Sequence, residues 1–281
     1  MKPEEKRRLM RTACQVRMGV IEATHAAKSG HPGGSLSAAD MFTYLYFKEL
    51  NVDPQRPDWE DRDRFVLSKG HTAPGLYSAL ANRGFFPLED LKTLRQIGSY
   101  LQGHPNMSTT PGVDMSTGSL GQGISAAAGM ALMAKYQHKS LRVYTLLGDG
   151  EIQEGQPWEA FMFAHHYKLD NLCVIIDNNH LQIDGPVEEV MSPYPIPDKL
   201  KAFGFEVMEI DGHDFDQMEH AFAKARCVKG VPFAIIMSTV KGKGVSFMED
   251  QASWHGKAPN DEEYALAMAE LQEHLARLEE N

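Results

Sequence analysis

The sequence predicts an α/β protein whose doubly wound, mostly parallel sheet carries helices on both faces. Short apolar segments alternate with helical patterns along most of the chain, and this order is typical of parallel sheets. The segment 172–176 is apolar except for its cysteine, as expected for a strand that is buried on both faces. Because 281 residues can bury a large core, we expect residues 1–281 to form one domain.

Each expected element follows from a local pattern. Apolar or small residues spaced by three and four positions predict a helix over 5–28. Ser37 and Asp40 form a capping-box-like pattern, so a second helix is expected to begin there and to run to Leu50. Gly84 predicts the end of the helix that follows the sequence SKGH. Strands are expected at 64–67, 143–147, 172–176, 205–210 and 232–239, and further helices at 87–96, at 118–137, from Pro157, at 214–229 and at 260–281. Residues 241–259 are expected to form a linker-like loop, and the acidic helix at 260–281 to pack on this domain or on a partner.

The composition excludes several classes of function. Lys and Arg number 28 against 38 Asp and Glu, which gives a net charge of −10 and no bulk attraction for nucleic acid or anionic membranes. The 3 cysteines are odd in number and lack CxxC spacing, so they are expected to be free thiols. The N-terminus lacks the apolar core of a signal peptide, and no run reaches the roughly 18 apolar residues of a membrane span. We therefore expect a cytoplasmic location.

Two turns rich in Gly, Asp and Asn each follow an expected buried strand. Gly148–Gly150 (GDG) follows the strand at 143–147, and Asp177–Asn179 (DNN) follows the strand at 172–176. Glycines let the backbone approach an anion, and carboxylate and amide oxygens are ligands that Mg²⁺ prefers. Either turn alone is ordinary at the end of a strand. Because ligands of open parallel sheets bind beyond the carboxyl ends of the strands, the two turns together favour a metal-bound diphosphate.

A further glycine-rich segment, Gly121–Ala126, fits the dinucleotide fingerprint G-x-G-x-x-A. That fingerprint needs an apolar strand directly before it and an acidic residue about 20 positions later. Here a polar turn at 110–119 precedes the segment, and Lys139 and Ser140 follow it in place of an acidic residue. We therefore reject a dinucleotide site.

The two metal-like turns resemble the metal and diphosphate motif of thiamine diphosphate enzymes, and GDGEIQEG at 148–155 is most similar to the transketolase version. SGHPG, SKGH, GHP and WHG also match transketolase segments in the same order, so that the resemblance covers roughly residues 5–260. It implies the diphosphate-binding domain of the thiamine diphosphate-binding fold. The implied cofactors are thiamine diphosphate and Mg²⁺ or Ca²⁺.

The resemblance implies roles for individual residues. Asp149, the side chain of Asn179 and the backbone carbonyl of Leu181 would bind the metal. The loop 116–123 resembles the transketolase loop whose backbone contacts the cofactor, although position 119 is commonly proline in that family. The implied cofactor-binding residues are His71, Gly118, Ser119, Leu120, Gly150, Glu151, Glu159 and Asn179.

Four histidines stand in loops beside Gly or Pro. A lone histidine in a loop is usually a surface residue, but imidazole suits reversible proton transfer near neutral pH. All four match transketolase positions, which implies catalytic roles for them. His31 and His255 would handle the proton of the donor hydroxyl group. His104 would contact the terminal hydroxymethyl end of the donor, and His71 would lie near the cofactor.

Two glutamates and one basic segment stay open in their interpretation. Glu154 and Glu159 lie near the start of the helix at Pro157, where acidic residues usually interact with the helix dipole. In transketolases the matching glutamates belong to an interface network that links paired active sites, so Glu154 is also a catalytic candidate. The segment Lys241–Gly244 is either a flexible basic turn, which the pattern favours, or a loop that closes over the bound cofactor.

The resemblance implies the N-terminal subunit of a split transketolase, which transfers a two-carbon ketol unit from a ketose phosphate to an aldose acceptor. A full-length transketolase continues into a pyrimidine-binding domain, and the sequence stops before it. We therefore expect a separate C-terminal subunit to supply that domain, in a heterotetramer of two plus two chains. The sequence does not identify the donor sugar, the acceptor sugar or the partner subunit.

Three alternatives stay open. The alpha chain of a 2-oxoacid dehydrogenase shares the GDG and NN turns, but the histidines of SGHPG and GHP argue against it. A protein similar to 1-deoxyxylulose phosphate synthase would share the loop Thr239–Gly244. A non-catalytic binding or regulatory relic of such an enzyme is the third alternative, and the complete histidine and metal motifs argue against it.

Overall fold

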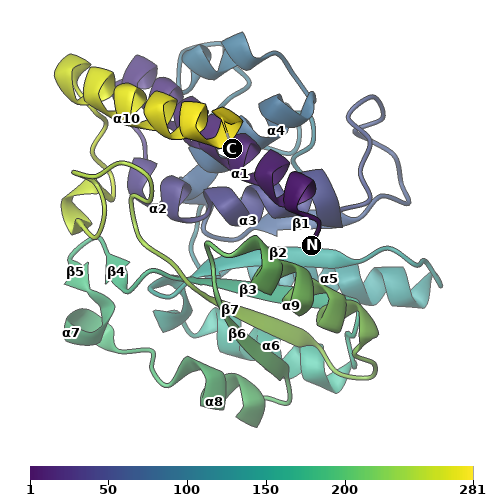
Figure 1. The fold of residues 1–281 in the computed structure, drawn as a ribbon. Helices are drawn as coiled ribbons and strands as arrows, with labels where there is room; N and C mark the ends of the chain where they lie inside the picture. The colour runs from purple at the N-terminus through teal and green to yellow at the C-terminus, as the bar shows by residue number, and fades with distance from the viewer. Residues whose placement is uncertain (281) are drawn as a thin grey trace.

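The computed structural model describes residues 1–280, and its centre is a five-stranded sheet (Figure 1). The strands are β1 (Arg64–Leu67), β2 (Val143–Gly148), β3 (Leu172–Asn178), β6 (Glu206–Asp211) and β7 (Phe233–Ser238). They lie in the order β1-β2-β3-β7-β6, and every neighbouring pair is parallel. The predicted strands and their parallel arrangement are therefore confirmed.

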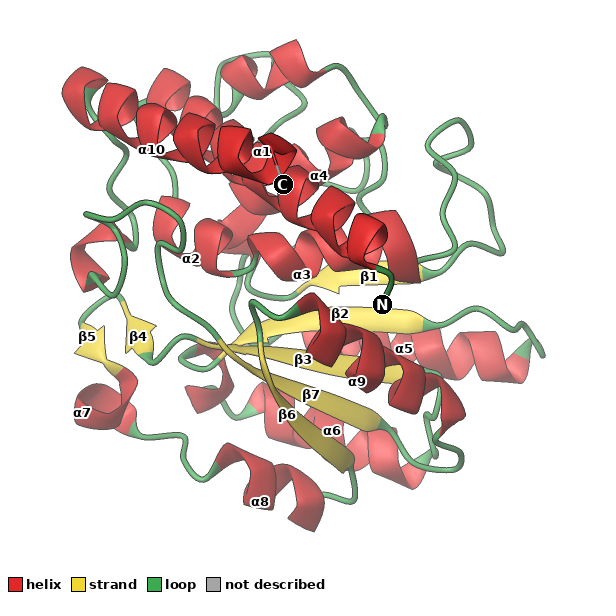
Figure 2. Cartoon of the chain, in the orientation of Figure 1, coloured by secondary structure: helices red, strands yellow, loops and turns green. Residues whose placement is uncertain are grey.

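Both faces of the sheet are buried. Along β3, Cys173 and Ile175 belong to one hydrophobic cluster, whereas Val174 and Ile176 belong to another on the opposite face. This alternation between two cores explains why the strand carries no polar residue before its carboxyl end. Helices cover the sheet on both sides, as the sequence predicts (Figure 2).

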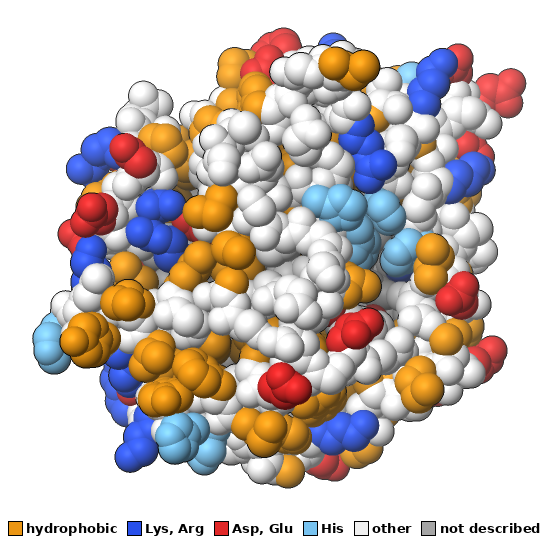
Figure 3. All heavy atoms as spheres, turned by 180° about the vertical axis from the view of Figure 1, so that it is seen from behind, with side chains coloured by type: hydrophobic (Ala, Val, Ile, Leu, Met, Phe, Trp, Pro, Cys, Tyr) orange, Lys and Arg blue, Asp and Glu red, His pale blue; other side chains and the backbone are white. Residues whose placement is uncertain are grey.

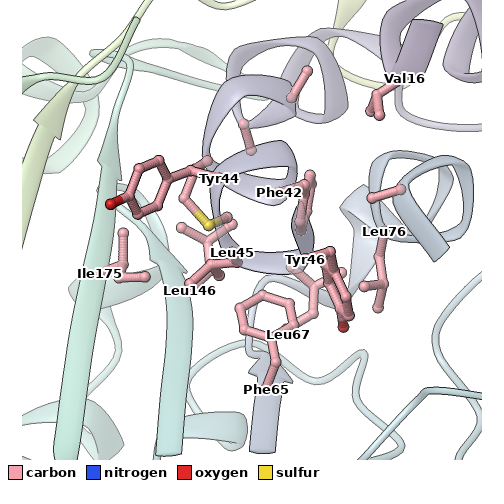
Figure 4. Close-up of a cluster of buried hydrophobic side chains, with 14 of the residues drawn as sticks. Val16, Phe42, Tyr44, Leu45, Tyr46, Phe65, Leu67, Leu76, Leu146 and Ile175 are labelled. Carbon is pink, nitrogen blue, oxygen red and sulfur yellow. The ribbon is translucent and has the colours of Figure 1, made fainter. Parts of the chain in front are cut away.

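The first core lies between the sheet and the helices α1 (Pro3–Ala27), α3 (Ala39–Tyr44), α4 (Ala73–Arg83) and α9 (Phe215–Cys227). Figure 4 shows part of it, where the rings of Phe42 and Tyr46 each lie 6.0 Å from that of Phe65 on β1. The second core lies beneath α5 (Gly123–Tyr136), α6 (Gln156–His166) and α8 (Ile196–Ala202). The two cores hold the strands so that their carboxyl ends share one edge.

The last helix, α10 (Asp261–Glu280), packs along α1, so helices from opposite ends of the described chain lie side by side (Figure 1). Ala267 and Leu271 are buried in one cluster with Cys14 and Ile21. The predicted apolar face of this helix therefore packs on the same chain. Residue 281, the last of the predicted helix, lies outside the described residues.

The segment around Ser37 differs from the prediction. Instead of one capped helix to Leu50, the chain forms α2 (Pro32–Ser37), α3 and a π-helical turn at Leu45–Glu49. The predicted capping box is wrong, because Ser37 donates its hydroxyl group to Asp177 and Asp40 pairs with Arg17. Both polar side chains make contacts with elements far away in the sequence.

Several short elements were not predicted. Between β3 and β6 lie the antiparallel pair β4 (Leu181–Gln182) and β5 (Gly185–Pro186), and the helices α7 (Val187–Met191) and α8. The helix expected at 87–96 is a 3-10 helix, Leu88–Thr93, and two more 3-10 turns lie at Gly70–Thr72 and Glu151–Gln153.

The segment 241–259 is not a linker. It contains the 3-10 turn Ala252–Trp254, and Val245, Met248 and Trp254 are buried within the domain. In the part of the chain that the structure describes, no helix combines the length and the apolar character needed to cross a membrane.

Candidate functional site

The carboxyl ends of four strands meet at one cavity of about 100 Å³, which we call the strand-end cavity. This edge of a parallel sheet is where ligands usually bind. The cavity is lined by Lys69 and His71 after β1, by Asp149 and Glu151 after β2, by Asn179 and Leu181 after β3, by Lys241 after β7, and by His255.

Asp149 follows β2 and has only 2% of its surface exposed. Its carboxylate accepts hydrogen bonds from the backbone N–H groups of Gly150 at 2.8 Å and His180 at 2.6 Å. Burial, followed by the neighbouring charge of Asp177, raises the pKa of Asp149 to about 7. A bound cation would oppose both effects, because it stabilises the ionised form of the carboxylate.

The three predicted metal ligands all line the strand-end cavity. Asn179 Oδ1 accepts the N–H of Leu181 at 3.2 Å, and the Leu181 carbonyl lies 3.4 Å from Lys241 Nζ. Together with Asp149 they offer carboxylate, amide and carbonyl oxygens, which is a donor set that Mg²⁺ or Ca²⁺ prefers. The described residues contain no group of three or more His, Cys, Asp or Glu suited to a metal, so this set depends on a single carboxylate.

Asp177, near the end of β3, is fully buried, and its carboxylate accepts hydrogen bonds from several side chains. Its carboxylate accepts from Ser37 Oγ at 2.6 Å, from Asn179 Nδ2 at 3.2 Å, and from the side chains of Thr239 and Lys69. Burial raises the pKa of Asp177, but the Lys69 charge and these hydrogen bonds outweigh burial and leave the pKa below its usual value. The group ties the ends of β1, β3 and β7 to α2.

Three of the four predicted histidines lie together, and two of them, His71 and His255, line the strand-end cavity. The ring centroids of His31, His71 and His255 lie 5.2, 5.4 and 5.1 Å apart, and Figure 3 shows histidine side chains gathered beside a hollow. Burial lowers the pKa of His31 to about 4 and, with the charge of Lys241, that of His255 to about 3. Burial also lowers the pKa of His71 well below its usual value. The three imidazoles are therefore neutral at pH 7.

One imidazole nitrogen of this group has no hydrogen-bond partner among the described residues. This nitrogen, His31 Nδ1, is buried. A buried polar atom without a partner costs free energy, and such atoms in native structures call for an explanation. A buried nitrogen without a partner beside His71 and His255 is therefore a candidate acceptor for a proton.

Lys241 is also part of the cavity, with 2% of its surface exposed. Its Nζ lies 3.2 Å from His255 Nδ1 and donates to the Leu181 carbonyl. Burial, followed by the charge of Lys69, lowers the pKa of Lys241 to about 8. The interpretation of Lys241–Gly244 as a flexible basic turn is therefore wrong at its first residue, whose side chain lies inside the protein.

Glu151 lines the cavity, but its carboxylate is engaged within the protein. It accepts hydrogen bonds from Ser68 Oγ at 2.5 Å, from the Gly121 N–H at 2.9 Å and from the Gly148 N–H at 3.0 Å. Glu151 thus joins the segments that follow β1 and β2 to the segment that precedes α5. Gly150, beside it, also lines the cavity.

The other predicted residues lie around the cavity. Leu120 reaches its wall, whereas Gly118 and Ser119 line a neighbouring hollow. His104 is exposed beside Gly118, where an added Cβ would come within 3.2 Å of the imidazole. The remaining two, Glu154 and Glu159, are exposed near the start of α6, so the structure does not bring them to the histidines.

Sequence reasoning assigned no role to Lys69, Asp177 or Lys241 as individual residues. Each stands at or just after the carboxyl end of a buried strand, as Asp149 does. That position was the available signal, because charged residues at this edge of a parallel sheet face the ligand site or one another.

Comparison with known proteins identifies close relatives. The family model described as "Transketolase, thiamine diphosphate binding domain" matches residues 9–274. The chain is 45% identical over 264 residues to a 6-deoxy-6-sulfo-D-fructose transketolase subunit of Clostridium sp. (strain MSTE9), covering 94% of this chain and 96% of that one. It is 43% identical over 263 residues to an apulose-4-phosphate transketolase subunit of Phocaeicola vulgatus, covering 94% and 93%.

Longer relatives match over part of their length. Human transketolase is 46% identical over 261 residues, which cover 91% of this chain and 41% of the human protein. The structure of transketolase from Campylobacter jejuni is similar with a TM-score of 0.89 and 34% identity, covering 99% of this chain and 46% of that one. The predicted fold and the predicted resemblance are both confirmed. The chain belongs to the transketolase family and corresponds to its thiamine diphosphate-binding domain.

Proposed function

We propose that the chain is the diphosphate-binding subunit of a transketolase that acts together with a second subunit. One observation carries the proposal: the oxygen atoms of Asp149, Asn179 and Leu181 line the same cavity as neutral imidazoles. An oxygen set alone would fit many cation sites. Together, the oxygen atoms and the imidazoles can bind a metal-bound diphosphate and accept protons within one site.

Asp149, the Asn179 amide and the Leu181 carbonyl would hold Mg²⁺ or Ca²⁺ with the diphosphate. Lys241 would lie beside that diphosphate, because a buried ammonium group without a carboxylate partner is stabilised by an anion. When bound, thiamine diphosphate supplies the chemistry that cleaves and forms carbon–carbon bonds next to a ketose carbonyl group.

The histidines would handle protons of the sugar. His31 and His255 are neutral at pH 7, so each has a lone pair that accepts a hydroxyl proton of the donor ketose. A bound diphosphate would raise their pKa values toward neutrality, because nearby negative charge favours the imidazolium form. His104 would contact the terminal end of the donor, and His71 would orient the cofactor.

The size of the strand-end cavity supports a second subunit. Sites for small molecules usually measure roughly 300–1,000 Å³. A cavity of about 100 Å³ has room for part of a cofactor only. The rest would be enclosed by the partner's pyrimidine-binding domain.

An apolar surface on α5 and α6 supports association with other chains. Met133, Tyr136, Met162 and Tyr167 are large apolar residues with 46% to 80% of their surface exposed. Figure 3 shows hydrophobic side chains gathered on this side of the molecule. Exposed apolar patches commonly mark protein interfaces. We propose that this surface is buried in a heterotetramer of two plus two chains, where the nearby Glu154 and Glu159 would link paired sites.

Calorimetric titration with thiamine diphosphate and Mg²⁺ tests the proposal. The chain is titrated alone and together with a protein that supplies the pyrimidine-binding domain, and Asp149→Ala serves as the control. We expect metal-dependent binding that is tight only with the partner and is lost in Asp149→Ala. Absence of binding under both conditions would favour the non-catalytic alternative.

A substrate panel then distinguishes the enzymatic alternatives. It contains ketose phosphates, and also 6-deoxy-6-sulfofructose and apulose 4-phosphate, because the two relatives of similar length are named for these sugars. Two-carbon transfer to an aldose acceptor would support the proposal. Release of carbon dioxide from a 2-oxoacid, or condensation of pyruvate with glyceraldehyde phosphate, would contradict it. Full ketol transfer by the purified single chain would contradict the need for a partner.

A further inference from the structure

We propose that Arg17, Asp40 and His213 form a positioning network for Lys241, and we call these three residues the turn clamp. The inference rests on the proposed function, because Lys241 acts there on the cofactor's diphosphate. The three residues lie outside the strand-end cavity and come from α1, from α3 and from the segment between β6 and α9. They hold the turn that follows β7, on the side away from the diphosphate site.

Asp40 is the centre of the turn clamp. The Arg17 guanidinium donates two hydrogen bonds to its carboxylate, at 3.0 and 2.5 Å, and both side chains are more than nine-tenths buried. Burial alone would raise the pKa of Asp40, but Arg17 and His213 outweigh it and leave the pKa at about 2. A bidentate pair of this kind fixes direction as well as distance.

The two outer members of the turn clamp hold opposite ends of one turn. Arg17 Nε donates to the Lys243 carbonyl at 2.9 Å. His213 Nε2 accepts the Val240 N–H at 3.0 Å, while its Nδ1 lies 2.7 Å from Asp40 Oδ2. Because a backbone N–H only donates, Nε2 carries no proton, and the proton on Nδ1 is donated to Asp40. Neutral His213 therefore connects the carboxylate to the turn by one donated and one accepted hydrogen bond.

Lys241 stands between the two held ends. The Lys243 N–H closes the turn on the Val240 carbonyl at 3.2 Å. Gly242, in the left-handed region at φ +79°, donates to the Gly33 carbonyl at 2.9 Å, and its close approach to Met248 leaves no room for a Cβ. The backbone of the turn is thus fixed while the Lys241 side chain extends into the strand-end cavity.

The far side of this turn is hollow. A cavity of about 410 Å³ is lined by all three members of the turn clamp and by Lys243 and Gly244. Within residues 1–280 no side chain fills that volume and packs against the turn. The hydrogen bond that Arg17 donates and the one that His213 accepts therefore hold the turn on that side, and their loss would let Lys241 move away from the diphosphate.

Hydrogen–deuterium exchange tests the turn clamp without cofactor. We compare the full chain with His213→Ala and with a matched control, His220→Ala, which removes an exposed histidine of α9. Loss of the bond to His213 should accelerate exchange in peptides covering 239–244 by about fivefold, since a net hydrogen bond is worth about 1 kcal/mol. His220→Ala should leave it unchanged. Equal exchange in His213→Ala and the wild type would overturn the proposal.

A double-mutant cycle tests the link to Lys241. Thiamine diphosphate affinity is measured with Mg²⁺ and the partner subunit for wild type, His213→Ala, Lys241→Met and the double variant. We expect about a tenfold loss from His213→Ala in the wild-type background and little further loss in the Lys241→Met background. Equal losses in both backgrounds would show that His213 acts by another route. If the wild type bound no cofactor, the proposed function would be contradicted. The exchange experiment would still test the turn clamp, because it is carried out without cofactor.

Chemical rescue separates positioning from general damage to the fold. Imidazole added to His213→Ala can both donate to Asp40 and accept from Val240, and the 410 Å³ cavity gives it access. It should restore slow exchange at 239–244 and most of the affinity. 1-Methylimidazole can accept but cannot donate, so it should restore less. His213→Gln, whose amide both donates and accepts, provides a second folded variant with an intermediate effect. Failure of imidazole and of His213→Gln alike would count against the turn clamp.

Discussion

Two buried aspartates follow neighbouring strands at the same edge of the sheet, but they differ in the partners that surround their carboxylates. Asp177 of β3 accepts hydrogen bonds from four side chains, including the ammonium group of Lys69. Asp149 after β2 accepts two backbone N–H groups, and no ion pair joins it to a cationic side chain within residues 1–280. The pKa of Asp177 is lowered, whereas burial and Asp177 raise that of Asp149 to about 7.

The difference shows which carboxylate stabilises the fold and which one favours a ligand. Lys69 neutralises the charge of Asp177 within the protein, so a bound cation is not required to stabilise this carboxylate. Ionisation of Asp149 costs free energy because the carboxylate is buried beside Asp177, and a bound cation would remove that cost. Residues whose environment destabilises them are typical of functional sites, and this contrast supports Asp149 as the metal ligand without reference to the family.

The largest effect is expected for Asp177→Ala. The substitution leaves the Lys69 ammonium group buried without its partner, which should lower the free energy of unfolding by about 3–5 kcal/mol. Urea denaturation followed by circular dichroism measures the change. The double variant Asp177→Ala, Lys69→Met removes both charges and should recover part of the loss. If Asp177→Ala were as stable as wild type, Asp177 would not be the structural member of the pair.

Asp149→Asn should produce the opposite result. Loss of the only carboxylate of the oxygen set should weaken metal-dependent binding of thiamine diphosphate at least about 100-fold, since charged ligands dominate Mg²⁺ affinity. The protein without cofactor should be at least as stable as wild type, because a buried unpaired charge is removed. Calorimetry and thermal unfolding measure the two effects on one sample. A variant that kept tight binding would exclude Asp149 as the metal ligand.

The stability gain of Asp149→Asn should depend on pH. The folded-state pKa of about 7 lies above the usual 3.8, so the folded protein binds this proton more tightly than the unfolded chain does. The cost of Asp149 is therefore absent below the unfolded pKa, grows between pH 4 and 7, and is constant above that. We expect a gain near zero at pH 4 and on the order of 4 kcal/mol at pH 8.

Chemical denaturation across this range measures the gain, with the exposed Asp184→Asn as the control. A gain that is the same at pH 4 and pH 8 would show that Asp149 has an ordinary pKa. Mg²⁺ and thiamine diphosphate, added with the partner subunit, should reverse the order of stability at pH 8, because they bind the folded wild type and not the variant.

The pattern of the sequence was sufficient for the sheet but not for every contact at its edge. Apolar runs identified β1, β2, β3 and β7, since a buried strand has few polar residues in its interior, whereas the edge strand β6 carries Glu206 and Glu209 and is only partly buried. The turns at Asp149 and Asn179 were recognised because Gly, Asp and Asn are rare inside buried strands. Roles for His31, His71 and His255 depended on resemblance, since the segments that carry them are far apart in the sequence.

Tertiary partners account for the residues that sequence patterns misplaced. Lys241 belongs to a segment of lysines and glycines that is typical of surface turns, and only its burial in the strand-end cavity distinguishes it. Ser37 and Asp40 have the spacing of a capping box, yet their partners Asp177 and Arg17 lie in distant elements. Local spacing cannot distinguish a cap from a long-range hydrogen bond when the same residue types serve both.

The smallest effect is expected for Ser37→Ala, which removes one of the four side-chain donors to Asp177. Three donors remain, so the free energy of unfolding should fall by about 1 kcal/mol, the typical net value of one hydrogen bond. If Ser37 were a helix cap instead, its loss would cost a similar amount, so stability alone does not separate the two interpretations. The double variant Ser37→Ala, Asp177→Ala does, because alanine at 177 leaves no acceptor for the Ser37 hydroxyl group. A bond between the two side chains predicts that Ser37→Ala costs much less once Asp177 is changed, whereas a helix cap predicts the same cost in both backgrounds.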